Sequence, residues 1–323
     1  MRREHFLPAV TVVLLALLLC GGVLFLLTMW IGGIGGARQS SSEAFCDFDV
    51  DSSGKRLIFS RGNELYAYEL HVQRASRLVA IKGQIRELCV LSDRWALVSV
   101  LQHPKRADSD ILLYRLDLQT GEMFRMTSEG GVWEGRVRKV SKTKFVFDQW
   151  EVKKGWDIHG LYRGTYIADA GNGTVSLLSL DTGSAYYNLE QILSDKKVLL
   201  SFPQVGGKKW LIGLLDKGIE EPNPKVVRRV PLKIVAHAAV GSPDGRYLYY
   251  TQENPAAQTT VVYKYTISNH TSQQITTLRA RVIQLKMGDE NLFILTDSAN
   301  PIVWRINTRD GALHKVVEIH SKR

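Results

Sequence analysis

A polar turn followed by an apolar strand occurs six times between Ser52 and Thr296, and this repetition limits the fold more than any other feature of the chain. The starts of successive copies are separated by 40, 49, 53, 48 and 46 residues. A spacing of roughly 40 to 50 residues is typical of β-propellers, in which each repeat forms one four-stranded blade. The copies are SSGKRLIFS from Ser52, SDRWALVSV from Ser92, SKTKFVFDQ from Ser141, SDKKVLLSF from Ser194, SPDGRYLYY from Ser242 and GDENLFILT from Gly288.

Each repeat contains the pattern for four strands. An apolar segment precedes the polar turn, an alternating segment follows the second strand, and a tight turn then leads to a fourth strand. Turns such as Asn172-Gly173 and Asp310-Gly311 tolerate the positive φ of a short hairpin. The segments before the turns begin at Ala44, Ile85, Gly135, Tyr187, Val235 and Arg281. We therefore predict an all-β fold, with a six-bladed β-propeller of four-stranded antiparallel blades at residues 44–320.

The repeats also predict how the ring closes. Because each repeat has all four of its strands, the last blade is expected to end on a strand at Ala312–Ile319 that packs against the first blade without strand exchange. In the alternative, part of Gln39–Phe45 pairs with that outer strand.

The amino-terminal segment predicts a single transmembrane helix before the propeller. Ala9–Ile31 contains 23 almost wholly apolar residues, and roughly 20 are enough to cross a bilayer. Arg2 and Arg3 precede it, which favours a cytoplasmic segment at residues 1–8 and an extracytoplasmic propeller, either periplasmic or extracellular. Residues 32–43 are predicted to form a Gly/Ser-rich stalk. We expect an uncleaved signal anchor, while cleavage near Ala37 stays open.

The chain is basic, with 42 Lys and Arg residues against 32 Asp and Glu residues. Such a surplus attracts anionic partners, such as lipid head groups, anionic glycans or acidic proteins. The basic clusters lack the regularly interleaved aromatic residues that stack on nucleic-acid bases. We therefore expect the partner to be an envelope or extracellular protein or an anionic glycan, and we expect no binding to nucleic acid. The amino-terminal helix is expected to contact the membrane.

Two cysteines, Cys46 and Cys89, occupy matching places in the first strands of the first and second repeats. Adjacent blades bring such positions close together, so a Cys46–Cys89 disulfide is one interpretation in an oxidising compartment. Two buried thiols on neighbouring inner strands are the other, and the sequence favours neither.

Two segments resemble the TolB-like propeller repeat: SPDGRYLYYT from Ser242 and LYRLDLQTGEMFRMT from Leu113. The resemblance covers approximately residues 44–319, although the full Ser-Pro-Asp-Gly turn occurs only in the fifth repeat. It implies a six-bladed disc. In TolB-like relatives the disc binds a partner protein and helps to organise the cell envelope, and the resemblance extends that expectation to this chain.

Motifs that would assemble a common catalytic or metal site are absent from the sequence. There is no Gly-x-Ser-x-Gly elbow, no His-Glu-x-x-His helix, no phosphate-binding Gly-rich loop and no Cys-x-x-Cys pair. The eight histidines lack ligand spacing. We therefore predict a protein that is not an enzyme and that has no metal site and no cofactor.

The innermost strands of a propeller direct side chains toward a central channel, which is a common ligand site. Alternation on these strands predicts that charged residues of both signs share the channel side, where they either bind a polar ligand or a metal ion, or pair with each other and with water. A shift of one residue would replace the whole set. The predicted set is Asp47, Asp49, Glu87, Arg136, Arg138 and His237.

Three functions fit these features. The first is a membrane-anchored, non-catalytic scaffold of the cell envelope that binds a protein or a glycan. The second is an enzyme acting on polysaccharide or a small metabolite at the channel mouth, with Asp47, Asp49, Glu87 and His237. The third is a ligand sensor that uses the long loops Val152–Tyr162 and Gly218–Arg228.

Overall fold

The computed structural model describes residues 47–51, 53–104, 109–128, 130–152, 161–180, 187–205, 207–297 and 300–319. All regular structure in these ranges is β-strand, so the prediction of an all-β chain is confirmed for them. The predicted segments 1–8, 9–31 and 32–43 lie outside the described residues. Within the described ranges, no helix is long and apolar enough to span a bilayer.

The strands follow one another in antiparallel sets of four, as the repeats predict. The first set is β1 (Phe48–Val50), β2 (Arg56–Arg61), β3 (Glu64–Glu69) and β4 (Arg74–Ala80). The second is β5 (Gln84–Val90), β6 (Trp95–Leu101), β7 (Ile111–Asp117) and β8 (Met123–Arg125). The third is β9 (Val132–Lys139), β10 (Lys144–Glu151), β11 (Leu161–Asp169) and β12 (Val175–Leu177).

The carboxy-terminal half repeats the arrangement. The fourth set is β13 (Asn188–Ser194), β14 (Lys197–Gln204), β15 (Gly207–Leu215) and β16 (Val226–Ala236). The fifth is β17 (Ala239–Gly241), β18 (Tyr247–Asn254), β19 (Thr259–Thr266) and β20 (Thr271–Leu278). The last is β21 (Arg281–Gly288), β22 (Asn291–Asp297), β23 (Ile302–Asn307) and β24 (Leu313–Glu318).

The second and third sets are joined, which the repeats did not predict. Ile111 of β7 pairs in parallel with Trp133 of β9, so that the two sets form one eight-stranded sheet. The short strand β8 pairs with β7 only from Tyr114 to Leu116. The edge of β7 at Ile111 therefore has no partner in β8. Strand β9 also begins three residues before the predicted Gly135 and reaches that edge.

A serine side chain builds the recurrent turn between the first two strands of several sets. In the fifth set the backbone N–H of Tyr247 donates to Ser242 Oγ at 3.0 Å, and Gly245 has the positive φ of 65° that favours glycine. The N–H groups of Trp95 and Lys144 donate in the same way to Ser92 and Ser141, at 3.1 Å each. This turn chemistry explains why a serine begins these repeats even where Pro and Gly are lost.

One inner strand begins later than predicted. Val235 and Ala236, assigned to the first strand of the fifth repeat, belong instead to the outer strand β16, and β17 starts at Ala239. Trp210 causes this difference, because its indole N–H donates to the Ala236 carbonyl oxygen at 3.1 Å and Ala236 pairs with Lys208 of β15. His237 therefore lies between two strands and not within one.

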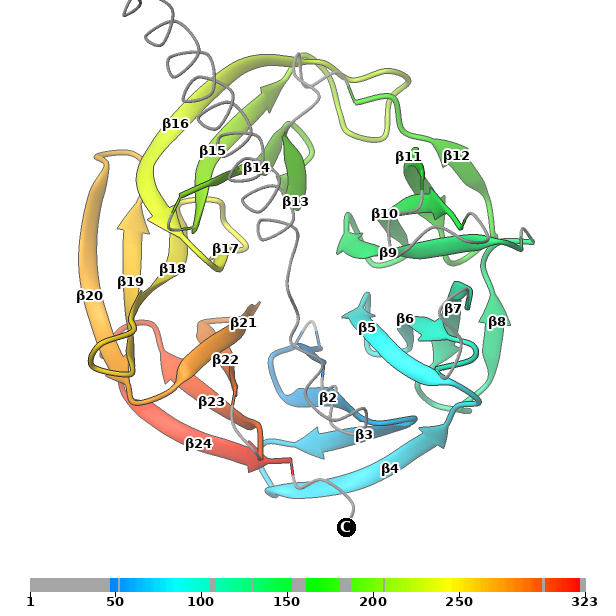
Figure 1. Ribbon diagram of the computed structural model, residues 1–323, viewed down its shortest axis with the longest axis horizontal. Coiled ribbons are helices and arrows are strands. Elements are labelled where there is room, and N and C mark those ends of the chain that lie inside the picture. Colours follow the sequence, from blue (N-terminus) through cyan, green and yellow to red (C-terminus); the bar gives the residue numbers. More distant parts are fainter. Residues whose placement is uncertain are drawn as a thin grey trace, which may run out of the picture. The chain divides into compact units, whose positions relative to one another are not determined.

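The sets are arranged around a common centre, with the first strand of each nearest to it (Figure 1). These inner strands contact one another in chain order, from β1 through β5, β9, β13 and β17 to β21. Strand β21 in turn contacts β1, so the arrangement closes on itself.

Among the described residues the core consists of six apolar clusters, each between two neighbouring sets of strands in the ring. The cluster that closes the ring joins the first set to the last. Phe48 and Leu57 of the first set pack there with Phe293 and Leu295 of the last, and all four are fully buried. Gly288 allows the close approach, since a Cβ atom there would lie 2.5 Å from Val50 Cγ1.

Closure uses no exchanged strand among the described residues. Strand β24 pairs with β23, and β1 pairs with β2. Within these ranges the last set ends as predicted, at 313–318 against the expected 312–319. Residues 39–45, which the alternative places beside this strand, lie outside the described ranges.

We expect Phe293→Ala to lower the free energy of unfolding by about 3–5 kcal/mol, because it leaves a cavity in the cluster that closes the ring. Urea denaturation of the purified full chain measures this loss. Phe124→Ala is the matched control, since the Phe124 side chain is 45% exposed and its loss costs about 1 kcal/mol or less. Equal losses in the two variants would contradict closure by this cluster.

Candidate functional site

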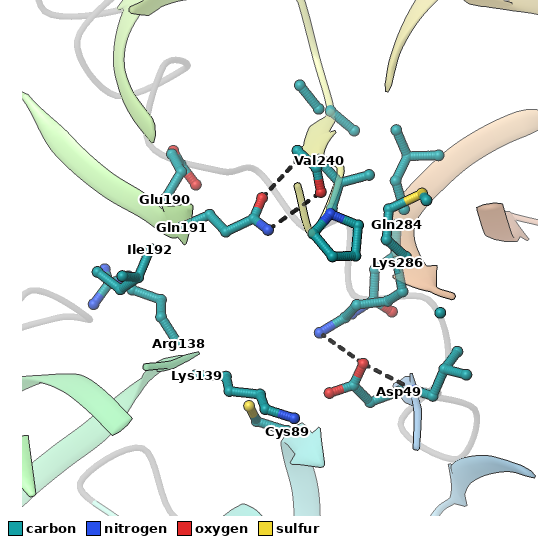
Figure 2. A pocket seen from close by; sticks show the side chains of 18 of the residues that line it. Asp49, Cys89, Arg138, Lys139, Glu190, Gln191, Ile192, Val240, Gln284 and Lys286 are labelled. Carbon is teal, nitrogen blue, oxygen red and sulfur yellow. Dashed lines mark hydrogen bonds and ion pairs between the residues drawn. The ribbon is translucent and has the colours of Figure 1, made fainter. Parts of the chain in front are cut away.

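Two cavities lie between the inner strands. The larger, which we call the wide chamber, has a volume of about 580 Å³ and is lined by β1, β5, β9, β13, β17 and β21. The smaller, the narrow chamber, has a volume of about 380 Å³. Both are lined by Val137, Arg138, Glu190, Ile283, Gln284 and Lys286. These chambers form the central channel, and Figure 2 shows the wide one.

The six residues predicted to share the channel side all line a chamber. Asp47, Glu87 and Arg136 line the narrow chamber, and Asp49 and His237 line the wide one. Arg138 lines both. The residues are thus distributed along the channel and do not converge on one point.

Asp47 and Asp49 use their carboxylates to hold β1 against β5. Asp47 accepts a hydrogen bond from the backbone N–H of Leu88 at 2.6 Å, and Asp49 accepts one from Val90 at 2.7 Å. The second oxygen of each carboxylate accepts the N–H of the next residue in its own strand. Both carboxylates are therefore engaged with backbone donors, and both side chains are buried.

The same kind of bond recurs between other pairs of inner strands. Glu87 of β5 accepts from the backbone N–H of Val137 in β9 at 3.3 Å. Gln191 of β13 accepts from the N–H of Gly241 in β17 at 2.8 Å and donates to the carbonyl oxygen of the same residue at 3.4 Å. Acceptor side chains on the inner strands thus join neighbouring sets at the wall of the channel.

Arg138 is committed to a buried ion pair. Its two terminal nitrogens donate to the two oxygens of Asp148, at 3.0 and 2.6 Å, in a bidentate arrangement. Thr165 donates to the same carboxylate at 2.6 Å. Arg136 lies 3.9 Å from Asp148 and donates to Asn188 Oδ1 at 2.9 Å. Neither arginine is isolated, and Arg138 in particular stabilises the third set.

Alternation failed to predict three residues of the last and fourth sets: Glu190, Gln284 and Lys286. Glu190 binds Lys208 at 2.8 Å, and Lys286 lies 3.7 Å from Asp49 Oδ1. The signal was in the sequence, because these segments align with the inner strands of the other repeats.

Bulges interrupt the simple alternation of side chains along the inner strands. Four inner strands each carry an extra residue at matching places: Arg86 in β5, Arg136 in β9, Glu190 in β13 and Ile283 in β21. Arg136 has a φ of 51°. All four line the narrow chamber. A bulge adds one residue opposite a single partner and redirects the side chains that follow, so a strict period of two breaks there.

Burial and local charge shift the acidity of several channel groups. Burial raises the pKa of Asp47 to about 6, against the opposing effect of Lys286, and burial also raises the pKa of Glu87. Burial by itself would lower the pKa of Lys286, but the charges of Asp49 and Asp47 outweigh it and raise that pKa. Lys286 is therefore an ammonium ion at neutral pH.

The Cys89 thiol is buried beside the wide chamber, and burial raises its pKa to about 12. It is a free thiol in the structure, while Cys46 lies outside the described residues, so the Cys46–Cys89 disulfide stays a prediction. Within the described ranges no group of three His, Cys, Asp or Glu side chains is arranged to hold a metal ion.

Several solved structures share the fold. The TolB protein of Acinetobacter baumannii matches with a TM-score of 0.59 and 12% identity, over 84% of this chain and 65% of its own length. A putative TolB from Agrobacterium tumefaciens gives a TM-score of 0.57 and 11% identity, over 81% of this chain and 91% of its own. The fold is a TolB-like β-propeller. Identities this low show the fold alone.

Enzymes also occur among the structural neighbours. An oligogalacturonate lyase in complex with manganese matches with a TM-score of 0.50 and 14% identity, over 84% of this chain and 78% of its own. No protein-family model and no curated protein sequence matches the chain. The TolB-like propeller fold is thus found in proteins with different functions, and the residues of the channel must indicate the function.

We expect the stability of the wild-type chain to depend on the ionisation of Asp47. Its folded pKa of about 6 exceeds the ordinary value of 3.8, so the folded state takes up a proton that the unfolded state does not as the pH falls through 6. When the pH is lowered from about 7.5 to about 4.5, the free energy of unfolding of the wild type should rise by about 2 kcal/mol relative to that of Asp47→Asn.

Urea denaturation at the two pH values measures this gain. Asp244→Asn is the control, because the hydrogen bond from Ser242 lowers the pKa of Asp244 and keeps that group ionised throughout this range. If the free energy of unfolding of Asp47→Asn rises as much as that of the wild type, the raised pKa of Asp47 is contradicted.

Proposed function

We propose that the chain is a six-bladed, non-catalytic propeller that binds a protein or glycan partner in the cell envelope. One observation carries this proposal: the acids that a catalytic site would need already hold the sets of strands together. Asp49 accepts backbone N–H groups from β1 and β5, and Glu87 accepts one from β9. Carboxylates occupied in this way are acceptors for the scaffold and not free general acids or bases.

The outer strands favour an anionic partner. Strands β4, β8, β12, β16, β20 and β24 together contain seven Lys and Arg residues and one acid, Glu318. Basic side chains also protect exposed strand edges from pairing with other chains. In our proposal the same charges attract an acidic protein or an anionic glycan to the rim. The basic residues are Arg74, Arg77, Arg125, Arg228, Arg229, Lys233 and Lys315.

The remaining parts of the proposal come from the sequence and the fold. We propose that residues 9–31 tether the propeller to the membrane, with residues 1–8 in the cytoplasm and the propeller on the other side. The TolB proteins among the structural neighbours support a binding role, and the lyase supports the alternative, an enzyme with its site at the channel mouth.

A substitution at Asp49 separates the two functions. If Asp49 is structural, Asp49→Ala should lower the free energy of unfolding by about 2–4 kcal/mol, because the substitution leaves backbone donors of two strands unpaired. For a domain of this size the melting temperature should fall by roughly 3–7 °C. If Asp49 is catalytic, the melting temperature stays nearly unchanged while turnover of a polysaccharide substrate is lost.

Differential scanning calorimetry of the purified full chain measures the melting temperature of each variant. Asp297→Ala is the control, because the Asp297 side chain makes an exposed ion pair with Arg281 at 3.8 Å and no other interaction with the described residues. The partner itself is sought by testing the immobilised full chain against anionic polysaccharides and against the envelope fraction of the source cells. Recovery of no partner at either low or moderate salt would contradict the binding role.

A further inference from the structure

Most charged groups of the wide chamber neutralise one another. Arg138 is paired with Asp148, and Lys208 is paired with Glu190 at 2.8 Å. Asp51 belongs to the turn after β1, where its carboxylate accepts the N–H groups of Lys55 and Arg56 and the Ser53 hydroxyl. These residues have little capacity left for a ligand.

Two further lysines line the wide chamber, Lys139 and Lys286, and only Lys286 has an ion pair with a described residue. Lys286 lies 3.7 Å from Asp49 Oδ1, and both oxygens of Asp49 already accept a backbone N–H. Lys139 lines the same chamber, and its side chain forms neither a hydrogen bond nor an ion pair with any described residue. Figure 2 shows both lysine side chains extending into the chamber from different strands, β9 and β21.

In the wide chamber Lys139, Lys286 and Asp49 together carry one positive unit of charge. The two acids of the narrow chamber that also attract Lys286, Asp47 and Glu87, are matched in number there by Arg86 and Arg136. Both ammonium groups lie close enough to Cys89 to lower the pKa of its thiol, although burial dominates and raises that pKa overall. The further acid of the lining, Asp289, is exposed on the turn after β21, where water screens it. A bound group with one negative charge would therefore neutralise the interior of the chamber.

The wide chamber is also lined by an apolar side chain that the fold leaves exposed. Ile283 is 45% exposed and lines both chambers. It is the extra residue of the bulge in β21, three positions before Lys286. Apolar surface next to a few oriented polar groups is the usual composition of a small-molecule site.

We propose that the wide chamber binds a small carboxylic acid with an apolar tail. The carboxylate lies between the ammonium groups of Lys139 and Lys286, and the tail lies against Ile283. This site is separate from the basic rim, so it does not depend on the partner proposed for the rim. The cavity of about 580 Å³ is large enough for such a ligand.

Isothermal titration calorimetry of the purified full chain with hexanoate tests the proposal. Hexanoate should bind at least about tenfold more tightly than acetate, because its additional methylene groups leave water at Ile283. Hexanamide has the same tail without the charge and should show no binding at the same concentrations. Inorganic phosphate serves as a competing anion without a tail and should not displace hexanoate at equal concentration.

Substitutions locate the site. Lys139→Met should weaken hexanoate binding at least about tenfold, as expected for the loss of a charge-assisted contact, and Lys139→Arg should keep most of the affinity. Ile283→Asn should weaken hexanoate while leaving acetate nearly unchanged. Lys142→Met is the matched control, since Lys142 is exposed on the turn between β9 and β10 and should bind like the wild type.

The proposal is supported if the ligands and variants show these affinities and the melting temperatures of the variants match that of the wild type. The proposal is overturned if hexanoate does not bind at millimolar concentration, if hexanamide or phosphate binds as well as hexanoate, or if Lys139→Met retains wild-type affinity. Should Lys139→Met unfold, Lys139→Gln and the Ile283→Asn variant provide the same test.

Discussion

Burial of every sheet face against its neighbours is the constraint on which the rest of the structure depends. A four-stranded antiparallel sheet with two apolar faces is not stable alone, and here each face packs into a cluster shared with the next set of strands. The first and last sets must also cover each other, and Phe48, Leu57, Phe293 and Leu295 do so. Since no described strand is exchanged, this side-chain packing and the ion pair between Asp49 and Lys286 join the ends of the ring among the described residues.

The channel follows from that closure. Inner strands that meet around a centre leave space between them, and their polar side chains find partners on the neighbouring strand. Asp47, Asp49, Glu87 and Gln191 all bind backbone groups of the next set. The same residues therefore form the wall of the channel and connect its sets of strands. A buried carboxylate with two backbone donors contributes to the scaffold, and this is why charge near a propeller axis is weak evidence for catalysis.

Much of the fold was predictable, because the repeat uses local chemistry. The turn serines, the hairpin glycines and the alternation of the second strands are all readable, and β7 (Ile111–Asp117) covers the start of the segment LYRLDLQTGEMFRMT. The candidate site was harder. Bulges at Arg86, Arg136, Glu190 and Ile283 break the period of two, and the displacement of β17 by the bond between Trp210 and Ala236 has no signal in the fifth repeat itself.

The sequence by itself determined the strands and their order, because turn residues and apolar alternation act over only a few neighbouring positions. Only the tertiary structure decided which polar side chains are occupied and which remain available. Alternation in the sequence selects Asp49 as a channel residue and omits Lys139. In the structure the Asp49 carboxylate accepts donors from two strands, whereas the Lys139 side chain has no hydrogen bond or ion pair with any described residue. Partners of this kind come from repeats that lie far apart in the chain, and the closed ring brings them together.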